Sequence, residues 1–275
     1  MICAIKNAAK HLPFIRQVYE KLRGWRAVGN ARRDAEVLFE NPEVYWQALT
    51  EKGSGTVELR AQGGLAITIR RNIWDARIVK EIFFDKPYVR HFKLPERPVV
   101  VDIGGYIGDF TLYAAKYLKA RKVIVYEPTK ENFEILSRNV ANNSFEGEVI
   151  AVNKAVGTDS EIRLNVDIGD YDEVHVSSYW YREAEQRVIP CVTLAELMET
   201  HGVDSVDLLK VDCEGGEYDI FPALEDATLG RIKNIVFEYH QIDGFQNKLV
   251  RVFNRLKAGG FTLRVDGLIA YAWRG

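Results

Sequence analysis

Acidic and histidine side chains follow several apolar segments of this chain, each at the point where the segment ends. Asp102 closes VVVDI, Glu127 follows VIVY, Asp212 follows VDLLKV, and NIVFEYH contains Glu238 and His240. The carboxyl ends of parallel strands meet at one edge of a sheet, which is where open α/β folds bind their ligands. The pattern therefore predicts one polar site assembled from distant parts of the chain.

The turn after the first of these segments is rich in glycine. Gly104, Gly105 and Gly108 permit a tight turn and a close backbone approach to a ligand, and the helix that follows offers unpaired N–H groups. The GxGxxG pattern of dinucleotide-binding proteins is not met, because Tyr106 stands at its second glycine. Asp102 is placed to accept hydrogen bonds from an ammonium group and would repel a pyrophosphate. A nicotinamide or flavin dehydrogenase is therefore disfavoured.

Glu127 adds a second requirement on the ligand. It lies roughly 20 residues beyond the glycine-rich turn, at the tip of the second strand, like the acid that binds a ribose diol. An amino-acid part near Asp102 and a ribose near Glu127 together predict S-adenosylmethionine. The alternative is that the glycine-rich turn and Glu127 only mark ordinary transitions from a strand to a helix and bind no ligand.

A second acidic cluster follows the fourth strand. Asp212, Glu214 and Glu217 can face the same crevice as the first site. Glu214 and Glu217 also fall in the first turn of an expected helix, where the helix dipole favours carboxylates. For Glu217 the capping role and the site role are equally supported.

Glu238 and His240 are two residues apart and project to the same side of the fifth strand. A histidine beside a carboxylate is a workable general base near neutral pH. His240 could instead be a hydrogen-bonded residue at a strand end. Asp212, Glu238 and His240 are also an alternative ligand set for a divalent metal.

The elements that must position these residues form an α/β pattern over 98–275. The expected parallel strands are Val99–Ile103, Lys122–Tyr126, Val149–Asn153, Val206–Val211 and Asn234–His240. The expected helices are Asp109–Leu118, Lys130–Asn142, Leu194–His201, Glu214–Ala223 and Asn247–Ala258.

Four further segments surround this pattern. They are a helical N-terminal extension over 1–52 with helices near 2–23 and 31–49, a hairpin and lead-in segment over 53–97, a β-rich insertion near the mouth of the site over about 161–192, and a C-terminal hairpin turning at Asp266-Gly267. The N-terminal helices could cap the site or make a homodimer. The run Tyr179-Trp180-Tyr181 could line the substrate pocket or pack in the core.

Composition narrows the class of protein. The formal charge of −2 offers no attraction to nucleic acid or to an anionic membrane. Cys3, Cys191 and Cys213 form no metal-binding or disulfide pattern, and Cys191 and Cys213 are interpreted as packing residues. No apolar run has the length of a signal peptide core or of a membrane span, so a soluble, cytoplasmic protein is expected.

The sequence resembles the FkbM family of S-adenosylmethionine-dependent methyltransferases. The resemblance covers about Tyr88 to Phe261 and rests on VVVDIGGYIGDFTLYAA, VIVYEPTKENFEILSRNV, VIAVNKAVG, VDLLKVDCEGGEYDI and IVFEYH, in family order. It implies a Rossmann-like class I methyltransferase with a seven-stranded, mostly parallel sheet and a reversed last strand. It also implies that Asp102 and Gly104–Gly108 meet the methionine part of the cofactor, Glu127 its ribose, and Asn153, Lys154 and Ala155 its adenine.

We therefore expect an O-methyltransferase acting on a hydroxyl of a small molecule, a sugar or glycan, or a polyketide-like acceptor. His240 or Asp212 is the expected base, with Glu214 and Glu238 orienting the acceptor. One alternative is a methyltransferase of nucleic acid or protein on the same fold. Another is a cofactor-binding interaction protein without catalysis that docks through its N-terminal helices.

Overall fold

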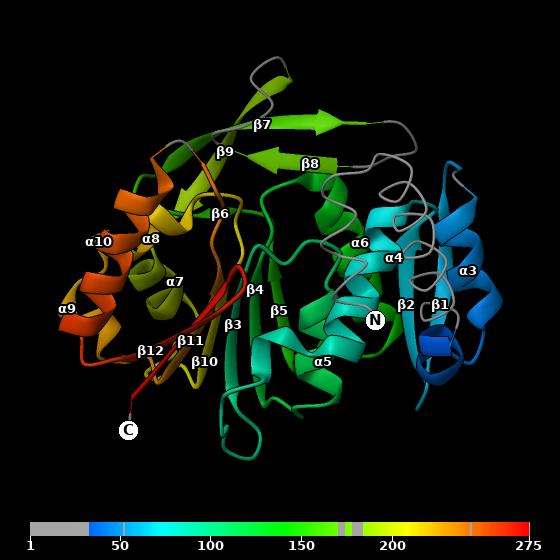
Figure 1. Cartoon of the computed structure of the whole chain (residues 1–275), viewed down its shortest axis with the longest axis horizontal. Coiled ribbons are helices and arrows are strands. Elements are labelled where there is room, and N and C mark those ends of the chain that lie inside the picture. The colour runs from blue at the N-terminus through cyan, green and yellow to red at the C-terminus, as the bar shows by residue number, and fades with distance from the viewer. Residues whose placement is uncertain (1–32, 52, 170–173, 178–183, 243, 275) are drawn as a thin grey trace, which may run out of the picture.

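A seven-stranded sheet forms the centre of the molecule (Figure 1). The structure is a computed structural model that describes residues 33–51, 53–169, 174–177, 184–242 and 244–274. In spatial order the strands are β12 (Thr262–Asp266), β13 (Ile269–Trp273), β11 (Asn234–Glu238), β10 (Leu208–Val211), β3 (Val99–Ile103), β4 (Lys122–Tyr126) and β5 (Val149–Val152). Only β13 runs against the others, because it pairs antiparallel with both β11 and β12. The predicted sheet with its reversed last strand is confirmed.

Helices cover both faces of this sheet, as the alternation of apolar side chains in β3 requires. Val100 packs with α5 (Asp109–Lys116) and α6 (Lys130–Asn142), whereas Val99 and Val101 pack with the helices of the opposite face. Those helices are α7 (Leu194–Thr200), α8 (Glu217–Ala223), α9 (Asp226–Leu229) and α10 (Phe245–Ala258). Both faces of the sheet are thus buried, which explains why its central strands are nearly continuous in apolar residues.

Several predicted boundaries are wrong by a few residues. The third strand ends at Val152 and the fifth at Glu238, while the fourth begins at Leu208 because Val206 makes only an isolated bridge. The helix expected from Glu214 begins at Glu217. Glu214 has a left-handed backbone, with φ of 52°, and such a residue cannot form the first turn of an α-helix.

The C-terminal hairpin turns one residue later than predicted. Asp266 pairs with Ile269, so the two-residue turn consists of Gly267 and Leu268. Gly267 has a φ of 65°, which glycine adopts at little cost.

The N-terminal extension differs from its prediction where it is described. The helix expected near 2–23, with any dimer contact made there, lies outside the described residues. The helix expected over 31–49 is broken, since residues 33–38 are helical and a second helix, α3 (Pro42–Thr50), begins after Phe39 bridges to Ala61. The Asn41 side chain accepts from the Arg60 amide and donates to the Glu58 carbonyl, and Pro42 starts the new helix.

The hairpin expected after the extension is confirmed as β1 (Thr56–Ala61) and β2 (Leu65–Arg70). Asn139 of α6 and Asn143, which follows that helix, bond to the free edge of β2. The Asn139 side chain accepts from the Thr68 amide at 2.6 Å and donates to the Thr68 carbonyl at 3.0 Å, and Asn143 does the same for Ala66. These bonds replace the partners that an edge strand lacks and fix the hairpin against the central domain.

Three short elements that the periodicity did not predict follow the hairpin. They are α4 (Ile73–Lys80), the π-helical segment η1 (Glu81–Asp85) and the 3₁₀ turn η2 (Pro87–Val89). The Asn72 side chain caps α4 by accepting from the Asp75 amide. These elements carry the chain to the carboxyl edge of the sheet.

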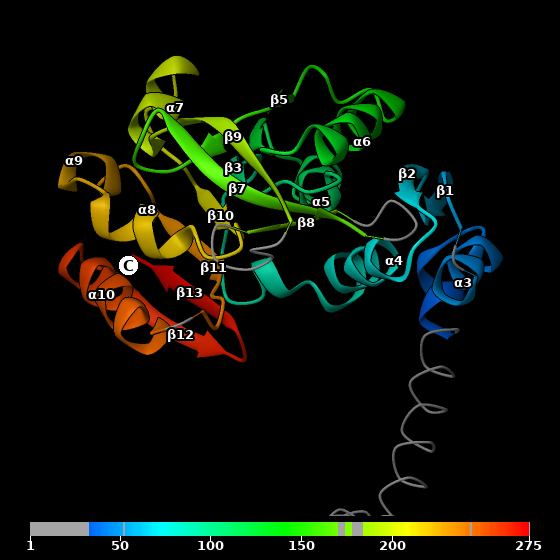
Figure 2. The same cartoon turned by 90° about the horizontal axis from the view of Figure 1, so that it is seen from above.

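The insertion over 161–192 is β-rich where it is described, as predicted. Strands β7 (Glu161–Ile168), β8 (Val174–Ser177) and β9 (Glu185–Val192) join β6 (Ala155–Val156) in a four-stranded sheet that lies over the carboxyl edge of the central one (Figures 1 and 2). Tyr179-Trp180-Tyr181 lies outside the described residues. Among the helices that the structure describes, none is long and apolar enough to cross a membrane.

Candidate active site

A cavity of about 440 Å³ lies at the carboxyl edge of the central sheet, roofed by the insertion. Eight of the predicted site residues line this cavity, and a ninth is buried next to it. The lining residues among them are Gly104, Tyr106, Glu127, Ala155, Asp212, Glu214, Glu238 and His240, and Asp102 is buried beside the lining residue Lys210. The polar ends of distant strands are therefore brought together, as the opening pattern indicated.

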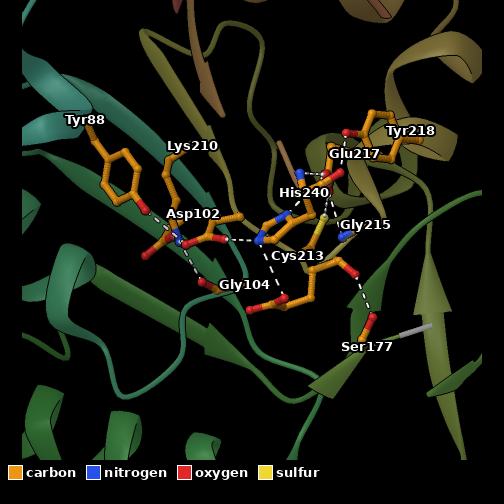
Figure 3. A network of polar contacts seen from close by, with 12 residues as sticks. Tyr88, Asp102, Gly104, Ser177, Lys210, Cys213, Gly215, Glu217, Tyr218 and His240 are labelled. Carbon is orange, nitrogen blue, oxygen red and sulfur yellow. Dashed lines mark hydrogen bonds and ion pairs between the residues drawn. The ribbon is translucent and has the colours of Figure 1, made fainter. Parts of the chain in front are cut away.

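Asp102 is fully buried and is engaged by the protein itself. Its Oδ2 accepts from Thr111 Oγ1 at 2.7 Å, and its Oδ1 lies 3.1 Å from the Nζ of Lys210 (Figure 3). Burial raises the pKa of Asp102, and Lys210 opposes that shift. The partner found for this carboxylate is thus an internal lysine, whereas the sequence suggested a ligand ammonium group.

Lys210 joins three parts of the site. It comes from β10, its Nζ donates to the Gly104 carbonyl at 2.6 Å, and it lies 3.9 Å from Asp212 Oδ2. Burial would lower the pKa of Lys210, but the charges of Asp102, Asp212 and Asp109 outweigh burial and raise it. The lysine is therefore a permanent cation that ties the glycine-rich turn to β10.

The glycines of this turn are required by packing inside the protein. A Cβ on Gly104 would lie 1.7 Å from the Asp212 carbonyl oxygen, and one on Gly105 would lie 2.2 Å from a methyl group of Val125. Gly104 and Gly108 also have positive φ angles of 79° and 86°. The tight turn is confirmed, and the close approach that it permits is that of the turn to the backbone of Asp212 and the side chain of Val125.

Glu127 is buried at the tip of β4 and holds the turn in place. Its Oε2 accepts from the Tyr106 amide at 2.9 Å, and its Oε1 accepts from the amide and hydroxyl of Thr129. A carboxylate oxygen has two acceptor positions, so Oε2 can take one further hydroxyl from the cavity side. Burial raises the pKa of Glu127, and the hydrogen bonds from Thr129 oppose that shift.

Only part of the segment expected beside the adenine reaches the cavity. Ala155 lines the cavity, whereas Asn153 and Lys154 are exposed and are not part of its lining. The side-chain Nδ2 of Asn153 donates to the Glu127 carbonyl at 2.9 Å and to the Pro128 carbonyl at 3.1 Å. Asn153 thus fixes the strand end that carries Glu127.

Asp212 reaches the cavity from the end of β10. Its Oδ2 accepts from the hydroxyl of Tyr88, a fully buried group, at 2.9 Å, and its Oδ1 lies 3.8 Å from His240 Nε2. Its side chain is 27% exposed, so the carboxylate faces the open space while its neighbours hold it. Burial raises the pKa of Tyr88 well above its usual range, followed by the charge of Asp212, so the hydroxyl remains a donor.

Glu217 is the anchor of His240. This fully buried carboxylate accepts through Oε1 from the His240 amide at 2.9 Å and from ring atom Nδ1 at 3.1 Å, and through Oε2 from the Gly215 amide. Burial lowers the pKa of His240, but the bond to Glu217 and the charges of Asp212 and Glu214 raise it to about 10. His240 is therefore a cation at neutral pH.

The cavity is rich in carboxylates. Burial raises the pKa of Asp109, Glu214 and Glu238 to about 7 each, and for Glu238 the neighbouring charge of Asp212 adds to it. The lining groups are six carboxylates, Glu81, Asp109, Glu127, Asp212, Glu214 and Glu238, against the cations Lys210 and His240. Such a site favours a ligand that carries positive charge.

The metal alternative gains no support from this arrangement. Within the described residues, no group of three or more histidine, cysteine, aspartate or glutamate side chains is arranged to hold a metal ion.

Cys191 and Cys213 are free thiols, and burial raises the pKa of Cys213 well above its usual range, in agreement with packing roles.

Several lining residues were not predicted from the sequence. Trp74, Glu81 and Tyr88 come from α4 and the two short segments after it, where no motif marked a site. Lys210 did carry a signal, since a lysine inside the buried strand VDLLKV requires a buried partner. Asp109, one residue after the glycine-rich turn, is likewise buried at the start of a helix.

The strand order, the reversed last strand and the glycine-rich turn after β3 define a class I methyltransferase of the Rossmann-like type. A model described as the methyltransferase FkbM domain matches residues 102–263. The chain belongs to the FkbM family of methyltransferases.

Known proteins similar to this chain include curated methyltransferases of fungi and bacteria. Methyltransferase 1 of Beauveria bassiana is 32% identical, over 69% of this chain and 82% of its own. The 31-O-demethyl-FK506 methyltransferase FkbM of Streptomyces tacrolimicus is 27% identical, over 68% of this chain and 81% of its own. A solved structure, methyltransferase FkbM from Methylobacillus flagellatus, shares 14% identity with a TM-score of 0.48, over 73% of this chain and 54% of that one.

Membership in the family implies the use of S-adenosylmethionine, and the cavity fits that cofactor in charge. S-adenosylmethionine carries a sulfonium and an ammonium cation against a single carboxylate, and this net positive charge suits the excess of lining carboxylates. Glu127 Oε2 has an acceptor position for a ribose hydroxyl, and Tyr106 lies beside it. The residues that would hold the cofactor are the turn from Gly104 to Tyr106, Glu127 and Ala155.

Proposed function

We propose that this protein is an O-methyltransferase that methylates a hydroxyl group of a small molecule, a sugar or a polyketide-like acceptor. The observation that carries the proposal is the position of Asp212 in the cavity, where Tyr88 and His240 hold a carboxylate that can receive a hydroxyl proton. When bound, S-adenosylmethionine supplies an electrophilic methyl group. What remains for the protein is to place the acceptor oxygen and to remove its proton.

Asp212 is the proton acceptor in this proposal. The hydrogen bond from Tyr88 leaves acceptor positions on both of its oxygens, and the side chain is open to the cavity. Glu238, from the end of the neighbouring β11, and Glu214 can each accept a hydrogen bond from the acceptor and so orient it. A positioned base of this kind typically accelerates a reaction about 10²–10⁴-fold.

His240 has an electrostatic role in the same proposal. With a pKa of about 10 it already carries its proton at neutral pH, so of the two bases expected from the sequence, His240 and Asp212, the proposal takes Asp212. Its Nε2 lies 3.5 Å from Glu214 Oε2 and 3.8 Å from Asp212 Oδ1. The cation therefore lies close to both carboxylates, and its charge opposes the burial that raises the pKa of Glu214.

The acceptor that suits this cavity is uncharged. A carboxylate or phosphate on the acceptor would be repelled by the acidic lining. Neutral hydroxyls find several acceptors for their hydrogen bonds, and Ile162, Leu164 and Val174 of the insertion supply apolar surface. A relative whose name describes O-methylation of a small molecule supports the same acceptor class.

The test is methyl transfer from labelled S-adenosylmethionine to panels of sugars, glycosides and macrolide alcohols, compared with amines and carboxylic acids of similar size. We expect transfer to hydroxyls and a loss of about 10²–10⁴-fold in kcat for Asp212→Asn. Asp207→Asn is the matched control, because Asp207 is also a paired carboxylate and precedes β10 at the opposite edge of the sheet. Transfer only to amines or carboxylic acids, or near-normal turnover in Asp212→Asn, would overturn the proposal.

A further inference from the structure

Tyr106 occupies a backbone conformation that favours glycine. Its φ is 48°, in the left-handed region, although it carries one of the largest side chains. It lies in the cofactor turn between Gly105 and Ile107 and lines the cavity. Something outside the turn must hold this residue, because the turn alone does not favour it.

The groups that hold Tyr106 come from the hairpin and α4. The Tyr106 hydroxyl donates to Asp75 Oδ1 at 2.6 Å, and the guanidinium of Arg70 lies 5.1 Å from the centre of the Tyr106 ring. Asp75 is fully buried, and its Oδ2 accepts from the backbone amide of Arg70 at 2.9 Å and from its Nε at 3.0 Å. One carboxylate therefore fixes both the ring of Tyr106 and the guanidinium that covers it.

A second route connects the same carboxylate to the ribose-binding candidate. Arg70 donates through Nη1 to Asn132 Oδ1 at 2.9 Å, and Asn132 Nδ2 lies 3.4 Å from Glu127 Oε1. Glu127 in turn accepts from the Tyr106 amide at 2.9 Å. The contacts form a closed circuit in which Asp75 reaches Glu127 through Tyr106 on one side and through Arg70 and Asn132 on the other.

We propose that Asp75 is a positioning residue for the cofactor site, acting through Tyr106 and Arg70 on the glycine-rich turn and on Glu127. The hairpin and α4 then form a working part of the cofactor site, although Asp75 and Arg70 precede the segment 102–263 that the family model matches. The inference rests on this cavity being the cofactor site and is independent of the acceptor.

The test is the affinity of the full chain for S-adenosylhomocysteine, measured by calorimetry in the absence of an acceptor, with thermal unfolding of each variant alongside. Tyr106→Phe removes only the hydroxyl that Asp75 holds, and we expect it to weaken binding about tenfold with little change in Tm. Tyr117→Phe is the matched control. It also removes a tyrosine hydroxyl bonded to the hairpin, at the Gln62 carbonyl, but far along α5 from the cavity, and we expect wild-type affinity.

Asp75→Ala completes a double-mutant cycle. In that background Tyr106→Phe should have no further effect on affinity, because the hydroxyl acts through Asp75. If Asp75→Ala fails to fold, Tyr106→Phe and its control decide alone. Unchanged affinity in Tyr106→Phe overturns the inference, as does an equal loss in Tyr117→Phe, whereas a wild-type chain that binds no S-adenosylhomocysteine overturns the cofactor assignment on which the inference stands.

Discussion

The buried pair of Lys210 and Asp102 gives the sharpest prediction for stability. The two side chains are 4% and 0% exposed, and their charged atoms lie 3.1 Å apart. Lys210→Met keeps the length of the side chain but leaves the Asp102 carboxylate buried with Thr111 as its remaining side-chain donor. Removing one partner of a buried ion pair typically costs about 3–5 kcal/mol, and we expect a loss of this size at pH 8.

The sign of the pH dependence follows from the same geometry. Without the lysine, burial raises the pKa of Asp102 further in the folded state, and a carboxyl with a raised pKa loses stability as pH rises through that value. The difference in unfolding free energy between wild type and Lys210→Met should therefore be larger at pH 8 than at pH 5. Urea unfolding at both pH values measures it.

A neutral pair is the control for this prediction. In the double variant with Lys210→Met and Asp102→Asn, the new amide oxygen can still accept from Thr111 and no buried charge remains. We expect the double variant to recover most of the lost stability, since replacing both partners of a buried pair is often close to neutral. A loss below about 1 kcal/mol in the single variant, or a double variant no more stable than the single one, would refute the electrostatic account.

Three further predictions concern the charge on His240, the charge of the cavity and the packing of the β1–β2 hairpin against α6. Glu217→Gln should lower the pKa of His240 from about 10 toward its ordinary value, which an NMR titration of the ring measures. In the wild type we expect stability to fall between pH 6.5 and about 10, as His240 loses its proton, and this fall should be smaller in Glu217→Gln. The affinity for S-adenosylmethionine should rise as pH increases through about 7, because three lining carboxylates ionise there. The affinity for S-adenosylhomocysteine, which lacks the sulfonium charge and has no net charge, should rise much less, and calorimetry on wild type and Glu238→Gln measures the difference. Asn139→Ala should speed hydrogen exchange of the Thr68 amide with little change in the exchange of the central strands, since the amide loses its acceptor.

Features that depend on neighbours in the sequence were predictable. The strand-turn-helix around Gly104 and the acid at the tip of the next strand follow local patterns of residue type, and both lie where those patterns put them. The carboxylates after β10 and β11 were predictable for the same reason, because parallel strands present their ends at one edge.

Features that depend on packing between distant segments were not predictable. Tyr88 and Asp212 are 124 residues apart, and no periodicity relates them. The charge on His240 depends on Glu217, for which the sequence supported a capping role and a site role equally. In the structure Glu217 is the first residue of α8 and also binds the histidine. Burial and pairing thus decide protonation, and both are properties of the folded chain.

The charge balance of the cavity explains why so many carboxylates can share it with the proposed reaction. Before transfer, a cofactor with a net positive charge offsets part of their negative charge; after transfer, the cofactor has no net charge and one proton from the acceptor hydroxyl must be held by the protein. Carboxylates with pKa values of about 7, such as Glu214 and Glu238, can share that proton with Asp212 at neutral pH. The cluster therefore loses one negative charge at the moment when the ligand loses one positive charge. Because His240, fixed by Glu217, keeps its proton throughout, the net charge of the filled cavity stays constant, and the transfer itself adds no uncompensated charge to the buried site.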